Sequence, residues 1–253
     1  EVPRVSVITV VKDDALGLKR TRNSLSDQTF NDWELLVVVA PSSDSTLDVA
    51  TEFQTIDPRI NLLKQTSTGI YQAMNEGIAA AVGDFIWFMN AGDIFTNHET
   101  LAHAVEKISK ISSGVLIGGY GILNGNTKQV YSYPAGEISL KDFAFSRRGG
   151  CHQAMIFQSS VLRDVGSFET KYSLASDFDL VLRVIKRSGG QRDSRIYASI
   201  EPGGRADQGI FLVHKEKHLI RRDLLGGLTV LFASLVWTGL ARTKILLRRI
   251  WNC

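Results

Sequence analysis

Short apolar runs alternate with longer segments of helical spacing along the first part of the chain, and this alternation constrains the fold more than any other feature. The apolar runs, each typical of a buried strand, lie at 5–11, 33–39, 60–65 and 85–89. The segments with helical spacing lie between them, at 16–28, 45–53 and 70–81. Strands that alternate with helices in this way form a mostly parallel sheet with helices against its faces. The chain is therefore predicted to be an α/β protein.

The second half of the chain is less regular, but it contains a ribbon and an amphipathic helix. The segments 114–124 and 129–134 are predicted to pair as an antiparallel ribbon. The segment 177–187 carries apolar residues on one helical face, and its helix is predicted to begin at Ser176 or Asp177. Asp177 and Asp179 then lie in the first turn, where the helix dipole favours negative charge.

Composition and charge bound the class of protein. The 253 residues, 44% of them hydrophobic, are enough for one sizeable α/β domain with or without an appendage. A net charge of +3 is not typical of a nucleic-acid binder, so no nucleic-acid partner is expected. The two cysteines, Cys151 and Cys253, are too few for a disulfide framework or a zinc site, and they fit a reducing cytoplasm.

Polar residues follow three of the predicted strands at the point where each strand ends. They are Lys12 to Asp14, Pro41 to Asp44, and Asn90 to Asp93. Open α/β sheets bind ligands at the carboxyl ends of their strands, so these residues are candidates for a ligand site. A plain β-turn is the alternative for the last of them, because small and amide residues favour turns. A turn alone does not account for the acid.

Five blocks occur in order between about residues 4 and 205. They read "PRVSVITVVKDD", "SLSDQTFNDWELLVVVAPSSDST", "GIYQAMNEGIAAAVGDFIWFMNAGD", "CHQAMIF" and "ASDFDLVLRV". Together they resemble glycosyltransferase family 2, whose members are inverting enzymes with the Rossmann-like GT-A fold and a nucleotide-activated sugar donor. The third block is similar to that of the subset that builds bacterial exopolysaccharides such as colanic acid. The resemblance implies the same fold and the same class of reaction.

The resemblance assigns roles to the acids of these blocks. Asp93 aligns with the metal-binding acid of the family's D-x-D-like motif, which implies a Mn²⁺ or Mg²⁺ ion beside the departing diphosphate. Asp177 aligns with the base that takes the proton of the acceptor hydroxyl, with a first-turn helix acid as the alternative. His152 and Gln153 are expected to face the acceptor or the diphosphate, with a buried structural histidine as the alternative for His152. Asp179 is expected to be structural or an acceptor contact.

The donor site implied by the resemblance draws on the strand ends and on the helix predicted at 70–81. Its residues are Val10, Lys12, Asp14, Val39, Gly69, Tyr71, Asn75, Asn90 and Ala91. Val39 and Ala40 stand where the family usually has an acid that reads the nucleobase. Asp13 or Asp14 is the candidate substitute for that acid. A UDP-sugar is the family's usual donor, and this departure weakens its assignment here.

Two other classes of protein stay open, the first because of this departure and the second because it shares a similar α/β sheet. A GT-A scaffold without catalytic activity, bound to a partner glycosyltransferase, would tolerate the loss of the acid. A nucleotidyltransferase would need a Gly-rich loop with Lys or Arg after the first strand. Residues 12–20, "KDDALGLKR", are a poor version of such a loop.

Several polar residues are weaker candidates for the site. Arg147 and Arg148 are candidates for contact with the diphosphate, with solvated charge as the alternative. The turn at 203–205 (Gly-Gly-Arg) either approaches the diphosphate or is a plain turn. His214 or His218 is the candidate third metal ligand, and a solvated histidine is the alternative for each.

The excess of positive charge lies in the C-terminal segment of the sequence. Residues 1–213 are predicted to form the glycosyltransferase domain, with a nucleotide-sugar half at 1–95 and an acceptor half at 96–213. The remaining tail, 214–253, has eight Lys and Arg residues against two acids. Its uncharged stretch at 224–241 and the basic "TKILLRRIW" predict a helix or helical hairpin on an anionic membrane surface. A single membrane span and a helix packed on the domain are the alternatives.

The expected protein is a cytoplasmic enzyme, peripheral at the inner face of the plasma membrane, with a lipid-linked or saccharide acceptor.

Overall fold

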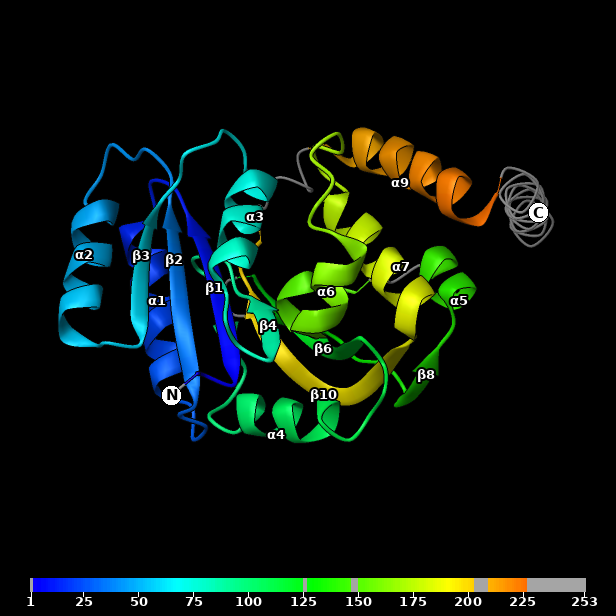
Figure 1. The fold of residues 1–253 in the computed structure, drawn as a ribbon, viewed down its shortest axis with the longest axis horizontal. Helices are drawn as coiled ribbons and strands as arrows, with labels where there is room; N and C mark the ends of the chain where they lie inside the picture. Colours follow the sequence, from blue (N-terminus) through cyan, green and yellow to red (C-terminus); the bar gives the residue numbers. More distant parts are fainter. Residues whose placement is uncertain (1, 125–126, 147–149, 203–208, 227–253) are drawn as a thin grey trace, which may run out of the picture.

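The computed structural model describes residues 2–124, 127–146, 150–202 and 209–226 (Figure 1). These residues form one ten-stranded sheet in the order β3-β2-β1-β4-β9-β6-β10-β5, with β7 beside β6 and β8 beside β10. The strands are β1 Val5–Val11, β2 Trp33–Val39, β3 Ile60–Lys64, β4 Phe85–Phe88, β5 Ile94–Phe95, β6 Val115–Asn124, β7 Thr127–Tyr131, β8 Gly136–Ile138, β9 Met155–Gln158 and β10 Gly190–Ile200. The helices are α1 Ala15–Ser26, α2 Thr46–Ile56, α3 Ile70–Ala80, α4 Thr100–Ile108, α5 Leu140–Phe145, the 3₁₀ turn η1 His152–Ala154, α6 Ser159–Val165, α7 Ser176–Ser188 and α9 Ile210–Leu225.

The first four strands pair as the apolar pattern predicts. β1 is parallel to both β2 and β4, and β2 is parallel to β3. The predicted ribbon is also confirmed, because β6 and β7 are antiparallel. β9 differs: it lies antiparallel between β4 and β6, so the second half is mixed rather than parallel. The reason is that β9 starts at the carboxyl end of β4, directly after η1, and a strand that starts at this edge must run the opposite way.

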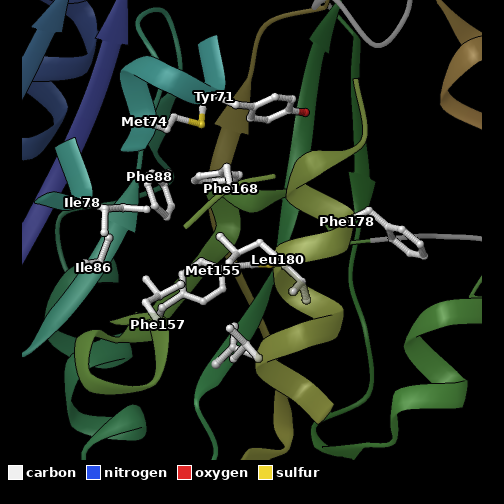
Figure 2. Packing of buried hydrophobic residues seen from close by; sticks show 14 of the residues in the cluster. Tyr71, Met74, Ile78, Ile86, Phe88, Met155, Phe157, Phe168, Phe178 and Leu180 are labelled. Carbon is white, nitrogen blue, oxygen red and sulfur yellow. The ribbon is translucent and has the colours of Figure 1, made fainter. Parts of the chain in front are cut away.

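The sheet is the middle layer of three, because alternate residues of each strand point to opposite faces. One apolar cluster joins the sheet to α3, α5, α6, α7 and α9, and Figure 2 shows part of it, with Tyr71 and Met74 of α3 near Phe88 of β4 and Phe168. The other cluster joins the opposite face to α1, α2 and α4. Burial on both faces explains why β1 and β2 are mostly apolar instead of alternating.

Helix α3 packs closely on β1 because it carries a glycine where the two elements touch. A Cβ atom at Gly77 would lie 2.5 Å from Cγ2 of Ile8. This close approach brings the start of α3 next to the carboxyl end of β1.

Helix α9 lies against α7 at one end of the molecule, drawn in orange in Figure 1. Its Ile220 is fully buried, so residues 210–225 follow the alternative in which this segment packs on the domain. Residues 227–253, which hold most of the predicted membrane-binding tail, lie outside the described residues. Across the part of the chain that the structure describes, no helix combines the length and the apolar character needed to cross a membrane.

Candidate active site

The carboxyl ends of β1 and β4 open into a cavity of about 600 Å³, a size typical of ligand sites. The predicted site residues that line it are Val10, Lys12, Asp14, Tyr71, Asn90, Ala91, Asp93, His152, Gln153 and Asp177. A second cavity of about 580 Å³ shares Val10, Lys12 and Ile70 with the first, and Gly69 and Ala40 also line it. The two cavities therefore share a wall at the end of β1.

Asp93 lies in the turn after β4 with only 6% of its surface exposed. Gln153 Nε2 donates a hydrogen bond to its Oδ2 at 2.8 Å, and the backbone N–H of Glu201 donates to its Oδ1 at 3.2 Å. The hydroxyl of Thr21 donates to the carbonyl oxygen of Asp93 at 2.7 Å and holds the turn against α1. Burial raises the pKa of Asp93 to about 6, and the two hydrogen bonds to the carboxylate offset this only in part. A cation beside the carboxylate would therefore stabilise its charged form.

A short chain of polar contacts connects Asn90 to Asp177 through His152. Asn90 Nδ2 lies 3.3 Å from His152 Nε2, and His152 Nδ1 lies 3.3 Å from Asp177 Oδ2. Because an amide nitrogen only donates, His152 accepts at Nε2 and donates from Nδ1 to the carboxylate. The Oδ1 atom of Asn90 is buried and has no hydrogen-bond partner among the described residues, so it is available to a ligand in the cavity.

Asp177 stands in the first turn of α7, as predicted. Its Oδ1 accepts a hydrogen bond from the backbone N–H of Phe178 at 2.8 Å, and its side chain remains 29% exposed to the cavity side. Burial favours the neutral form, but the interactions with His152 and the charge of Lys217 outweigh it and hold the pKa of Asp177 below its ordinary value. Asp177 is therefore ionised near neutral pH and is able to accept a proton.

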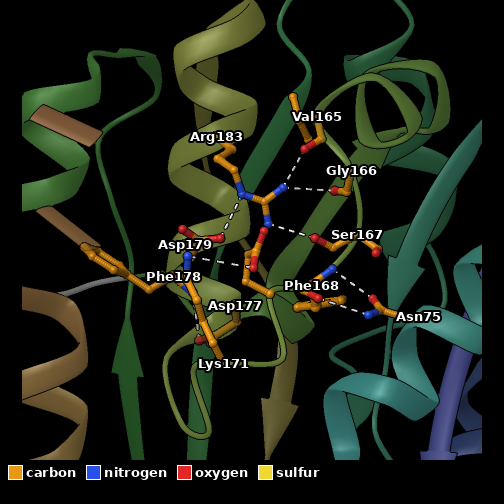
Figure 3. Close-up of polar contacts among 11 residues, drawn as sticks. Asn75, Val165, Gly166, Ser167, Phe168, Lys171, Asp177, Phe178, Asp179 and Arg183 are labelled. Atoms are coloured by element: carbon orange, nitrogen blue, oxygen red, sulfur yellow. Dashed lines mark hydrogen bonds and ion pairs between the residues drawn. The ribbon is translucent and has the colours of Figure 1, made fainter. Parts of the chain in front are cut away.

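Two predicted site residues, Asp179 and Asn75, use their polar atoms inside the fold instead (Figure 3). Asp179 pairs with Arg183 Nε at 2.8 Å, and the same guanidinium donates to the carbonyl oxygens of residues 165, 166 and 167. Asn75 donates to the carbonyl oxygen of Phe168 at 3.0 Å and accepts from its N–H at 2.8 Å. Neither residue lines the cavity, and the ion pair of Asp179 favours the structural one of its two expected roles.

The remaining sequence candidates lie apart from the cavity or outside the described residues. Val39 is buried in the apolar cluster on the α1 face, so only its neighbour Ala40 lines a cavity. His214 and His218 are exposed on α9 and do not line either cavity. Arg147, Arg148 and the turn at 203–205 lie outside the described residues.

Two charged residues near the site were not among the candidates predicted from the sequence. Glu201 follows the end of β10, lines the cavity, and pairs with Arg20 of α1 at 2.8 Å. The rule that pointed to Asp93, an acid in the loop that follows a strand, also applies to Glu201. Lys217 of α9 is partly buried and interacts with Asp177. No sequence signal connects it to Asp177, because helix packing alone brings them together.

The cavity fits a divalent cation that is shared with a substrate. In the described part of the chain, no group of three or more His, Cys, Asp and Glu side chains is placed to hold a metal ion. Mg²⁺ is commonly bound by one or two carboxylates together with substrate phosphates. Asp93 supplies one buried carboxylate, and the unpaired Oδ1 of Asn90 lies at the same strand end. The residues thus fit a cation held between Asp93 and a phosphate group rather than a cage made by protein alone.

A three-layer α/β fold with a cleft at the strand ends fits the GT-A class of sugar-transferring enzymes, and the comparisons with known proteins show this class. Residues 6–166 match the family model described as Glycosyl transferase family 2. The chain belongs to this family and is a glycosyltransferase.

Individual proteins that resemble this chain are also glycosyltransferases or share the fold. An uncharacterized glycosyltransferase of Mycobacterium tuberculosis is 32% identical over 185 residues, which cover 72% of this chain and 68% of that protein. Among solved structures, TarS 1–349 of S. aureus in complex with UDP has a TM-score of 0.69 at 20% identity and covers 87% of this chain and 66% of its own. The chain spans only 40% of the longer TarS structure. The mannosyltransferase PcManGT of Pyrobaculum calidifontis, solved with GDP-Man and Mn²⁺, has a TM-score of 0.63 at 17% identity and covers 96% of this chain and 81% of its own. Structural similarity to TarS and PcManGT at 20% and 17% sequence identity shows a shared fold.

Proposed function

We propose that this glycosyltransferase is an inverting enzyme that transfers a sugar from a nucleoside-diphosphate donor to a hydroxyl of a lipid-linked or saccharide acceptor. The reaction would belong to the assembly of a bacterial surface polysaccharide. The observation that carries the proposal is that two acids with oppositely shifted pKa values line one cavity. Asp93 is buried with a raised pKa, and Asp177 is ionised and partly exposed.

Asp177 is the proposed base. The acceptor oxygen attacks the anomeric carbon, the bond from that carbon to the phosphate oxygen breaks, and its electron pair leaves with the nucleoside diphosphate. The acceptor's proton passes to Asp177 Oδ2, which the hydrogen bond from His152 Nδ1 orients at 3.3 Å. Attack on the face opposite the leaving group inverts the anomeric configuration.

Asp93 is the proposed metal ligand. A divalent cation, when bound, would offset the negative charge that develops on the departing diphosphate. Gln153 and the backbone of Glu201 hold the two carboxylate oxygens of Asp93 in place. The Mn²⁺ in the PcManGT structure supports a cation in this fold.

The second cavity is the proposed site of the nucleoside. Residues of the loop before α3 line it, together with Ala40 and Pro41 after β2. No acid lines this cavity within the described residues, so the base must be recognised by other groups. Proteins with this fold bind different nucleotides, UDP in TarS and GDP-Man in PcManGT, so donors of both kinds belong in the test.

The test is a panel of nucleotide sugars with Mn²⁺, read by nucleotide release and by thermal shift. At least one donor is expected to stabilise the protein and to be consumed with an acceptor. If no nucleotide sugar binds or is consumed, the chain is a non-catalytic scaffold and the proposal is wrong.

The variant Asp177→Asn tests the base. It should lose transfer by about 10²–10⁴-fold while donor binding remains, because only proton transfer is removed. Asp48→Asn is the matched control, since Asp48 also lies in the first turn of a helix but on α2 away from the cavity. Full transfer by the Asp177 variant would exclude Asp177 as the base.

A further inference from the structure

Helix α9 contributes one buried carboxylate to the loop that precedes α7. Glu216 is only 6% exposed. Its Oε1 accepts hydrogen bonds from the N–H of Ser173 at 2.8 Å and the hydroxyl of Ser173 at 3.0 Å, and its Oε2 accepts from the N–H groups of Leu174 and Ala175, both at 2.9 Å. A buried charge is costly unless its hydrogen-bonding capacity is filled, and here each oxygen accepts two bonds. We refer to Glu216 with residues 173–175 as the Glu216 cluster.

The Glu216 cluster leads directly into the proposed catalytic helix. Ala175 is the residue at which α7 is capped, and Asp177 follows two positions later. Ser173 and Leu174 also line the main cavity. The backbone that Glu216 fixes is therefore both part of the cavity wall and the immediate support of the base.

Further contacts from α9 reach the same place. Lys217, next to Glu216, lies over the ring of Phe178 at 5.0 Å and interacts with Asp177. One turn later Arg221 donates from Nε to the carbonyl oxygen of Ala144 at 2.7 Å and lies 5.2 Å from the centre of the Phe178 ring. The inner face of α9 is thus in contact with the start of α7 over more than one turn.

We propose that Glu216 is a positioning residue for the transfer reaction, acting through the Glu216 cluster to place Asp177 against the acceptor hydroxyl. The inference rests on the proposed role of Asp177 as the base. It makes α9 part of the catalytic unit, although α9 lies beyond residues 6–166, which match the family model. Misplacement of a catalytic group by about 1 Å is enough to cost on the order of 10²-fold in rate.

The variant Glu216→Gln keeps the size of the side chain but turns an NH₂ group toward backbone donors. We expect kcat to fall by about 10- to 100-fold, because the base is misplaced. The KM for the donor should stay within about threefold, since the interaction lost acts on the transition state rather than on donor binding. Amide hydrogen exchange at residues 173–175 should accelerate in the same variant.

Glu34→Gln is the matched control for the loss of a buried carboxylate. Glu34 is 7% exposed and accepts hydrogen bonds from the Ser6 hydroxyl at 2.5 Å and the Val82 N–H at 3.0 Å. These residues lie at the opposite ends of the strands from the cavity. The control should lower the melting temperature but leave kcat per folded enzyme and the exchange at residues 173–175 unchanged.

The outcomes separate this inference from the proposed function. If the wild type transfers sugar and Glu216→Gln has the same kcat, or if both variants lose kcat equally, the positioning role is wrong while the function stands. If the wild type consumes no donor, the function is wrong, and the positioning role falls with it. If the amides of residues 173–175 exchange without protection in the wild type, the hydrogen bonds of the Glu216 cluster do not form, and the inference is wrong whatever the activity.

Discussion

Replacement of Asp93 by Asn is expected to stabilise the protein above pH 6, although it removes the proposed metal ligand. Burial raises the pKa of the Asp93 carboxyl from 3.8 to about 6. Between about pH 4 and pH 6 the folded state therefore holds a proton that the unfolded state has released. By linkage, the free energy of unfolding falls as the pH rises through this window, and the full cost is present above about pH 6.

The magnitude follows from the pKa and from the hydrogen bonds at the site. A pKa raised from 3.8 to about 6 corresponds to about 3 kcal/mol of unfolding free energy. Asn avoids this cost. Relative to the protonated carboxyl, it offers one acceptor oxygen instead of two to Gln153 and the Glu201 N–H, a loss of about 1 kcal/mol at any pH. The expected net effect is a gain of about 2 kcal/mol at pH 7.5 and a loss of about 1 kcal/mol at pH 4.

The assay is urea unfolding of the wild type and of Asp93→Asn from pH 4 to pH 7.5, in the presence of a chelator so that no cation stabilises the wild type. Asp84→Asn is the control for the loss of one negative charge, because the Asp84 side chain is 70% exposed. The reasoning predicts that the difference between Asp93→Asn and the wild type changes sign within this range. A difference that does not depend on pH, or a variant that is less stable at pH 7.5, would refute it.

Two further predictions concern the polar contacts around α7. His152→Ala removes the interaction that lowers the pKa of Asp177, so the pKa of the base rises and the acidic limb of the kcat–pH profile should move to higher pH; an unmoved limb would contradict the contact. Arg183→Met leaves the buried carboxylate of Asp179 without its partner and should lower the free energy of unfolding by about 3 kcal/mol in urea titrations. Arg187→Met removes the exposed pair with Asp164 and should cost less than about 1 kcal/mol; equal losses from the two arginine variants would argue against a special role for the buried pair.

Much of the architecture was accessible from local pattern. The mostly apolar runs of β1 and β2 indicate strands buried on both faces, and the helix expected at 177–187 is α7 at Ser176–Ser188. The position of Asp93 in the loop after a buried strand was enough to place it at the ligand-binding edge of the sheet. These inferences succeed because strand burial and helix periodicity are properties of neighbouring residues.

Residues on helices were harder to assign, because a helix presents all of its faces and only its neighbours decide which face is used. Asn75 belongs to the block that resembles the family most closely, yet its amide pairs with Phe168, which is 93 positions away in the chain. Asp179 follows Asp177 by two residues, and this spacing turns it away from the cavity toward Arg183.

The class of fold and the edge of the sheet that carries the site are thus encoded locally, in the alternation of apolar runs and in the polar residues that end them. The pKa of each acid, in contrast, is not encoded locally. Asp93 owes its raised pKa to burial, and Asp177 owes its lowered pKa to His152 and Lys217, which come from η1 and α9. Burial and charge pairing depend on which distant segments pack together. For this reason two aspartates that look alike in the sequence become, in the folded protein, a candidate metal ligand and a candidate base.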